Sequence, residues 1–152
     1  MQIMFEVSGK PFGKQRPRFK RMGAFVKTYT PEETVNYENL VKYNCQQEME
    51  RLNFNGWFND EPLEVFILSC FEVPKSYSKK RTEDALHSRL FPTRKPDIDN
   101  QLKIVLDSLN GVLYHDDVQV ISAHVDKKYA KSPTTKVIVR DKPIKVKGKE
   151  EK

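Results

Sequence analysis

The chain has 152 residues, 11% of them aromatic, which is enough for one domain with a buried core and argues against general disorder. Apolar runs are too short for a membrane helix, no secretory signal is recognisable, and the cysteines show no disulfide or zinc spacing, so we expect a cytoplasmic protein. A formal net charge of +6 favours a polyanionic partner, and nucleic acid is the commonest one in a cytoplasm.

The first third of the chain is predicted to contain a strand, a basic segment and a long helix. Residues 3–7 have the pattern of a strand. Residues 8–30 contain no acid, and proline and glycine interrupt them, so they read as a loop or an irregular hairpin. The helix is expected over 31–52, with Thr30 as its N-cap at the start of a capping box. An apolar stripe along this helix includes Cys45, which we therefore interpret as a core residue.

The middle of the chain alternates between apolar and basic segments. Residues 63–73 are apolar on both faces at their centre, which predicts a central strand covered on both sides. Residues 75–95 are rich in basic residues and poor in periodicity, and we expect a mobile loop there. Residues 100–109 carry apolar side chains at helical spacing and are predicted to form a second helix.

The last part of the chain completes the sheet. Strands are predicted over 118–125 and 136–139. The order of elements indicates a mixed α/β or α+β fold, a small two-layer domain in which a mixed β-sheet packs with two main helices. We expect this single domain to span residues 1–140 and the charged tail, 141–152, to be disordered.

Basic residues concentrate in two stretches that contain few acids or none. Lysine and arginine on exposed, adaptable backbone are the usual contacts to phosphates. For the first stretch, the alternative is a solvated loop whose aromatic side chains fold into the core. The candidate DNA contacts are Lys14, Arg16, Arg18, Lys20 and Arg21 in the first stretch, and Lys79, Lys80, Arg81, Arg94 and Lys95 in the second.

Aspartates follow the second basic stretch directly. Asp97 and Asp99 are one residue apart, and on an extended backbone their side chains would leave the same face. Like charges that close repel unless a cation lies between them. Asp99 also stands at the expected N-cap of the second helix, and Lys103 follows one turn later on the same face. If the strand after Asp116 and Asp117 pairs near the strand end that carries Asp97, one of the two joins the cluster.

Three or four carboxylates with one lysine suit the Mg²⁺-dependent hydrolysis of a phosphodiester. Carboxylate oxygens are ligands for a hard cation, which can activate water and stabilise the leaving oxygen. A lysine can neutralise the charge that builds on the non-bridging oxygens. The basic segments would hold a polyanion that the acids alone repel. Spacing alone leaves a plainer interpretation open, in which Asp99 is only a helix cap and Asp116 and Asp117 form only a turn.

These residues occur in an ordered pattern, D-I-D-N-x-x-K-x-x-x-D-x-L followed after a short spacer by D-D-x-Q-V. In this order they resemble the RusA-type Holliday junction resolvases. The N-terminal G-K-P-x-x-K-Q-R-P-R, residues 9–18, is similar to the start of many such proteins, and the resemblance spans roughly residues 3–140. The matching positions in the main motif are Asp97, Asp99, Asn100, Lys103, Asp107, Leu109, Asp116, Asp117, Gln119 and Val120.

The resemblance implies a small homodimer that binds four-way DNA junctions and nicks two strands symmetrically with Mg²⁺, in DNA recombination and repair. Mn²⁺ is an alternative ion, and neither a small-molecule cofactor nor a membrane is implied. The family's catalytic residues fall on Asp97, Asp99, Lys103 and Asp117, with the three aspartates as metal ligands and Asp116 as an auxiliary one. A phage or prophage origin fits such genes. The insert over 76–95 is longer than in compact members, which leaves the mode of junction binding open.

Three other functions are compatible with the residues. A replication-fork nuclease would use the same site on a broader set of branched substrates. A DNA-binding module without catalysis would bind junctions equally well with or without Mg²⁺ and never cut them. A metal-dependent glycosyltransferase also uses a D-x-D pair, but the chain is short for a nucleotide-sugar domain, and the basic segment has no role there.

Overall fold

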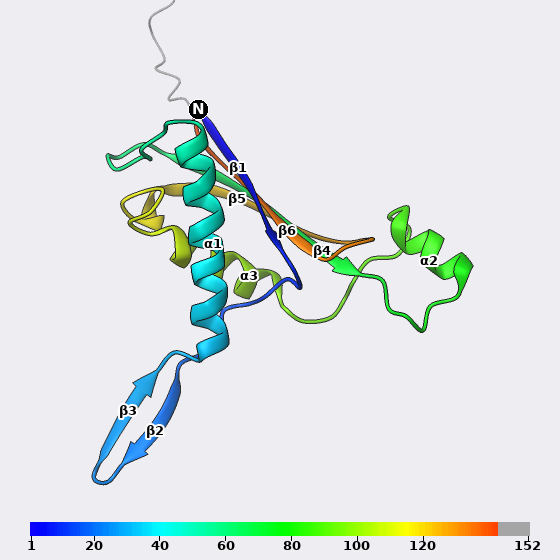
Figure 1. Cartoon of the computed structure of the whole chain (residues 1–152), viewed down its shortest axis with the longest axis horizontal. Coiled ribbons are helices and arrows are strands. Elements are labelled where there is room, and N and C mark those ends of the chain that lie inside the picture. Colours follow the sequence, from blue (N-terminus) through cyan, green and yellow to red (C-terminus); the bar gives the residue numbers. More distant parts are fainter. Residues whose placement is uncertain (143–152) are drawn as a thin grey trace, which may run out of the picture.

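The computed structural model describes residues 1–142, and residues 143–152 lie outside it. The described residues form a four-stranded mixed sheet, a separate two-stranded hairpin and three α-helices (Figure 1), which confirms the expected mixed α+β class. Most of the predicted tail falls outside the described residues. Its first residue, Asp141, ends the last strand, and its carboxylate accepts a hydrogen bond from the amino group of Met1 at 3.0 Å. No helix within the described range is long and apolar enough to cross a membrane.

The four-stranded sheet has the order β1-β6-β4-β5, with β4 parallel to β5 and the other neighbours antiparallel. The predicted central position of β4 is therefore confirmed. A 3₁₀ turn, Asp117–Gln119, precedes β5. In chain order the strands and helices are β1 (Gln2–Ser8), β2 (Arg18–Met22), β3 (Phe25–Tyr29), α1 (Glu32–Arg51), β4 (Leu63–Glu72), α2 (Lys79–Leu86), α3 (Ile98–Leu109), β5 (Val120–Ala130) and β6 (Thr134–Asp141).

Helices α1 and α3 pack on one face of this sheet (Figure 1). Alternate residues of β4, such as Val65 and Ile67, are buried beneath these helices. Cys45 of α1 is buried in the same core, which confirms its predicted position. Burial raises the pKa of the Cys45 thiol to about 12. On the opposite face Met4 is 56% exposed. The expectation that β4 is covered on both sides is wrong for the described residues, because a two-layer fold leaves one face of the sheet without helices.

The direction of α3 follows from the parallel pairing of β4 and β5. A parallel pair needs a crossover connection, and α2 and α3 provide it. At the beginning of α3, Gln101 bonds to Ser69 near the carboxyl end of β4. At the other end, Asn110 bonds to the backbone of Asp117, just before β5. Helix α3 therefore runs back along the sheet, from the end of β4 to the start of β5.

Two local expectations are wrong in the structure, and a third is confirmed. The capping box at Thr30 is wrong, because α1 begins at Glu32, its N-cap is Pro31, and no side chain caps it. The segment expected as a mobile loop contains α2, whose N-cap Ser78 accepts a hydrogen bond from the backbone of Arg81 at 3.2 Å. The first basic segment forms the β2–β3 hairpin, which confirms the hairpin interpretation, and this hairpin projects beyond the first turn of α1 (Figure 1).

Candidate active site

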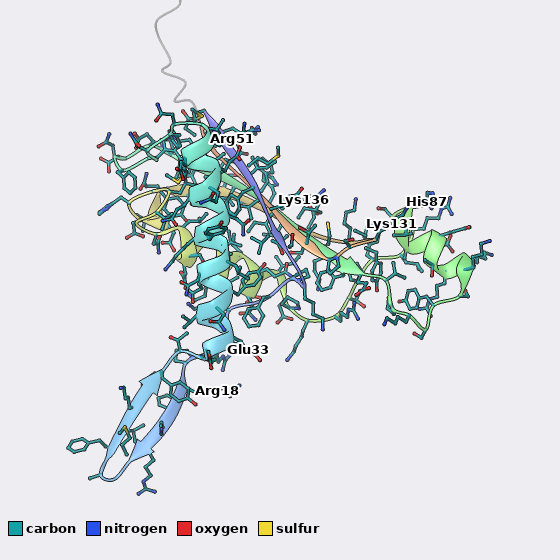
Figure 2. The ribbon with its side chains drawn as sticks, viewed as in Figure 1. Arg18, Glu33, Arg51, His87, Lys131 and Lys136 are labelled. Atoms are coloured by element: carbon teal, nitrogen blue, oxygen red, sulfur yellow. The ribbon has the colours of Figure 1, made fainter. Side chains whose placement is uncertain are left out.

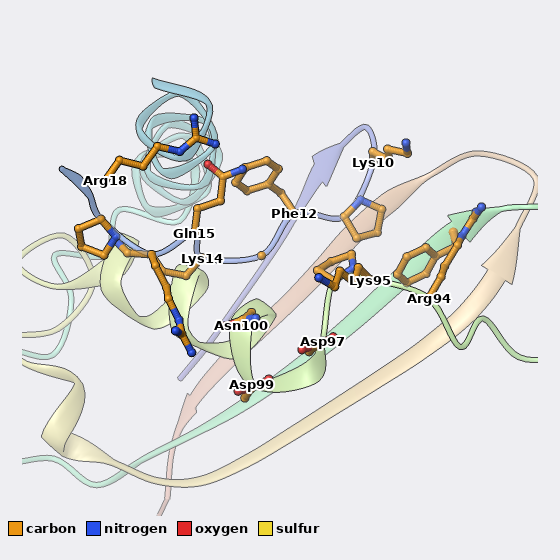
Figure 3. Close-up of a pocket in the computed structure, with 16 residues that line it drawn as sticks. Lys10, Phe12, Lys14, Gln15, Arg18, Arg94, Lys95, Asp97, Asp99 and Asn100 are labelled. Carbon is orange, nitrogen blue, oxygen red and sulfur yellow. The ribbon is translucent and has the colours of Figure 1, made fainter. Parts of the chain in front are cut away.

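An open groove of about 800 Å³ lies between the N-terminal basic segment and the start of α3 (Figure 3). Residues 10–18 form one wall, and residues 94–97 with Asp99 and Asn100 form the other. Asp97 and Asp99 both line the groove, as do the cations Arg16, Arg18, Arg94 and Lys95. The structure therefore brings the predicted acidic pair together with part of each basic stretch.

Three hydrogen bonds fix the backbone on either side of this groove. The amide oxygen of the buried Gln101 accepts a hydrogen bond from Ser69 at 2.7 Å, and its Nε2 donates to the carbonyl of Pro96 at 3.3 Å. Opposite, the N–H of Lys14 donates to the carbonyl of Asn100 at 2.9 Å. A Cβ on Gly13 would lie 2.8 Å from Cβ of Pro96. Glycine thus lets the basic segment approach the residues that precede Asp97.

The cap of α3 differs from the expected one. Asp97 occupies the N-cap and Asp99 lies in the first turn, and Asp97 makes no side-chain capping bond. The predicted role of Asp99 as the cap is therefore wrong. Helix α3 begins earlier than its apolar stripe indicates, because Gln101 and Asn100 are held by β4 and by the basic segment.

A second acidic group lies at the far end of α3. Asp116 is the N-cap of the 3₁₀ turn and accepts a hydrogen bond from the N–H of Val118 at 3.3 Å. The N–H of Asp117 donates to Oδ1 of Asn110, the residue that ends α3, at 2.9 Å. Burial raises the pKa of Asp117, and the neighbouring carboxylates of Asp116 and Asp107 raise it further.

The four predicted metal ligands do not converge within one chain. Helix α3 has 12 residues, about 18 Å at 1.5 Å per residue, and it separates Asp97 and Asp99 from Asp116 and Asp117. Among residues 1–142, no three acidic, cysteine or histidine side chains are placed to share a metal ion. The condition under which Asp116 or Asp117 would join Asp97, a strand that pairs near the strand end before Asp97, is not met within one chain. Since β5 is parallel to β4, it begins beside the start of β4, where Val120 pairs with Leu63.

Asp107 connects two lysines between the acidic groups. Its Oδ2 lies 3.3 Å from Nζ of Lys103 and 3.5 Å from Nζ of Lys14. The same Nζ of Lys14 lies 2.9 Å from Oε1 of Glu38. Burial alone would lower the pKa of Lys14, but the carboxylates of Glu38 and Asp107 together raise it. The side chain of Lys14 is 20% exposed, whereas that of Lys103 is 61% exposed. Lys103 is therefore the more accessible of the two to a bound phosphate.

The other expected DNA contacts lie in three places. The groove contains Arg16, Arg18, Arg94 and Lys95. The hairpin carries Lys20 and Arg21, and α2 carries Lys79, Lys80 and Arg81, at opposite ends of the long axis of the molecule (Figure 1).

Sequence reasoning missed the role of Gln119 as a support for the aspartate turn. Its Oε1 accepts hydrogen bonds from the N–H groups of His115 and Asp116 at 3.0 and 3.2 Å. Its Nε2 donates to the carbonyls of Trp57 and Glu61 at 3.3 and 3.2 Å. The only signal in the sequence is its place in D-D-x-Q-V, which does not reveal the contacts with the loop before β4.

We expect Gln119→Leu to lower the free energy of unfolding by about 1–3 kcal/mol. Four backbone groups lose their hydrogen-bond partner, while leucine keeps a similar side-chain volume. Urea unfolding followed by circular dichroism measures the effect. Gln47→Leu, on the exposed side of α1, is the control and should change stability by less than about 0.5 kcal/mol. Equal losses for the two variants would show that the hydrogen bonds of Gln119 contribute nothing measurable.

Two comparisons find similar proteins. The family model for endodeoxyribonuclease RusA matches residues 8–140. The uncharacterized protein YqaN of Bacillus subtilis (strain 168) is 33% identical over 141 residues, which cover 91% of this chain and 96% of the relative. The matched region includes both walls of the groove and both ends of α3.

Proposed function

Since the chain belongs to the RusA family of endodeoxyribonucleases, we propose that it resolves four-way DNA junctions by paired, Mg²⁺-dependent nicks during DNA recombination and repair. The observation that carries this proposal is the groove that Asp97 and Asp99 line together with basic residues of two separate segments (Figure 3). An acidic pair alone would repel a phosphodiester. The cations on the walls supply the attraction that holds the DNA backbone beside the carboxylates.

The donors in the groove fit Mg²⁺ in kind. In enzymes that act on phosphates this ion commonly takes one or two carboxylates and completes its shell with water and phosphate oxygens. Asp97 and Asp99 would hold it, and Mn²⁺ would use the same oxygens. When bound, the ion lowers the pKa of a water molecule and stabilises the leaving oxygen. The protein's own part is to orient the strand through its cations and to present Lys103 to the reacting phosphate.

We also propose that the active form is a homodimer, because symmetric nicking of a junction requires two active sites. The two ends of α3 give this proposal a specific form. In the dimer, Asp117 of one copy serves the Asp97 and Asp99 pair of the other. This arrangement would reconcile the catalytic role that the family resemblance implies for Asp117 with its distance of about one helix length from Asp97.

The proposal is tested with a labelled, immobile four-way junction incubated with the protein in Mg²⁺ or in EDTA. We expect paired nicks at symmetric positions in Mg²⁺ alone, and none in a linear duplex of the same sequence. A replication-fork probe cut as fast as the junction would favour the broader fork nuclease instead. Tight junction binding without cleavage in Mg²⁺ or Mn²⁺ would contradict the proposal and favour a binding module.

Arg16→Ala combined with Arg18→Ala should weaken junction binding and flatten its dependence on salt. Each lost phosphate contact should reduce the slope of log affinity against log salt by about one, because fewer counterions are released. Affinity is measured in EDTA across a salt series. Arg51→Ala with Lys136→Ala, at the far end of α1 and on β6 (Figure 2), is the control pair and should leave the slope unchanged. Parallel lines for both pairs would show that residues 16–18 do not contact phosphates.

A further inference from the structure

We propose that the β2–β3 hairpin binds unpaired nucleobases by stacking them on Phe19 and Phe25. This inference rests on the proposed function only in taking DNA as the ligand. It deepens that function, because it names the feature of a branched substrate that the protein would recognise. A base inside a duplex is stacked on both faces, whereas a base at an open branch or in a single strand offers a free face.

The hairpin exposes its aromatic side chains to an unusual degree. Phe19 is 73% exposed and Phe25 is 79% exposed, and every residue of both strands is exposed. Neither strand packs extensively against any other helix or strand of the described chain, and the side chains project away from the rest of the protein (Figure 2). A lone two-stranded hairpin is marginally stable, and clustered exposed apolar side chains mark interaction sites. The rings are therefore placed for a ligand.

The strand register places a phenylalanine ring and at least one cation on each face of the hairpin. Phe25 pairs with Met22 on one face, beside the neighbouring pair of Lys20 and Lys27. Phe19 lies on the other face, and Arg21, two residues later, is the next residue of the same strand on that face. Single-stranded nucleic acid alternates a flat base with a phosphate, and proteins bind it with stacking rings flanked by basic residues. The hairpin has this alternation on both faces.

The charge of the hairpin favours a nucleic acid over a second copy of this chain. Lys20 and Lys27 lie directly opposite each other, an arrangement that destabilises a strand pair. Residues 8–30 contain no acid, and in the part of the chain that the structure describes neither lysine has an ion-pair partner. A phosphate near both ammonium groups removes their repulsion. A second hairpin would bring the same positive charge and increase it.

The hairpin is also continuous with the candidate active site. Arg18 lines the groove and is the first residue of β2. A strand held beside Asp97 and Asp99 therefore reaches the hairpin after leaving the groove. In this arrangement the groove binds the DNA backbone near the cut, and the hairpin binds bases that are unpaired at the branch.

The test is the double variant Phe19→Leu and Phe25→Leu, which keeps apolar side chains and removes the flat rings. Affinity is measured by fluorescence anisotropy in EDTA for a single-stranded oligonucleotide, a four-way junction and a linear duplex of equal length. We expect a loss of about tenfold or more for the single strand and the junction, and less than about twofold for the duplex. Tyr43→Leu, an exposed ring on α1, is the matched control and should change none of the three.

Three results would overturn the inference. The first is unchanged affinity of the variant for all three probes, and the second is an equal loss of affinity that includes the duplex. The third is a sedimentation experiment in which the wild-type protein is a dimer and the double variant is a monomer. The last would assign the rings to a contact between copies. The melting temperature should not change, because neither strand of the hairpin packs extensively against another element of residues 1–142. Failure of the proposed function is distinguishable. Wild-type protein that never nicks a junction in Mg²⁺, while the variant still loses single-strand affinity, would reject nuclease activity and keep the hairpin inference.

Discussion

Asp97→Asn and Asp99→Asn should each slow junction cleavage by about a hundredfold or more and leave junction binding in EDTA intact. The asparagine amide keeps the shape of the side chain and removes the negative charge that a hard cation requires. Binding should persist because the basic walls are untouched, and it can tighten because a charge near the phosphates is lost. Single-turnover cleavage at saturating protein measures the effect. Asp126→Asn, an exposed aspartate on β5, is the control and should cut at the wild-type rate.

Asp117→Asn should have an equally large effect if the active site forms between two copies. Mixing inactive variants tests the arrangement directly. A dimer of one Asp97→Asn copy and one Asp117→Asn copy retains a complete site when the two groups come from different copies, so mixing should restore nicking of one strand. It retains none when both groups come from the same copy. No recovery after exchange of subunits would contradict the shared site, and a near wild-type rate for Asp97→Asn alone would contradict the metal assignment itself.

The elements that local spacing determines could be predicted well. Helix α1 and strand β4 lie within one or two residues of their expected ranges, because runs of apolar residues at helical or strand spacing decide both. The start of α3 was less predictable. Its first turn is held by Gln101 contacting Ser69, a residue 32 positions earlier, and by the approach of Gly13. Contacts between residues so far apart in the sequence produce no periodic pattern of residues near the start of the helix.

The arrangement of the acids depends on the direction of β5, which no spacing along the chain encodes. The sequence places Asp97 and Asp117 in one motif, yet the parallel pairing of β4 with β5 puts them at opposite ends of α3. The same limit applies to α2. Its Ala85 is buried against Phe71 and Tyr129, residues from two different strands, so a segment with little periodicity of its own becomes a helix. In both cases tertiary contacts, and not local propensity, determine the structure that the segment adopts.

Lys103→Ala should slow the cutting step by about a hundredfold while changing junction affinity much less. The ammonium of Lys103 is exposed and lies on α3 between the two acidic groups, 3.3 Å from the carboxylate of Asp107. An exposed ion pair of this kind contributes little to stability, so the variant should unfold at nearly the wild-type denaturant concentration. Its charge acts on the phosphate in the transition state, and loss of one such contact typically costs about 3 kcal/mol of barrier.

The decisive measurement for Lys103 is the single-turnover rate at saturating protein, compared with the affinity in EDTA. Lys103→Arg keeps the charge with a different geometry and should recover part of the rate, which a purely structural role would not predict. Lys14→Ala provides a contrast at the same carboxylate. Its ammonium is largely enclosed by Glu38 and Asp107, so its loss should lower stability. A full rate with reduced affinity for Lys103→Ala would make this lysine an ordinary phosphate contact, and the reacting phosphate would then lie elsewhere along α3.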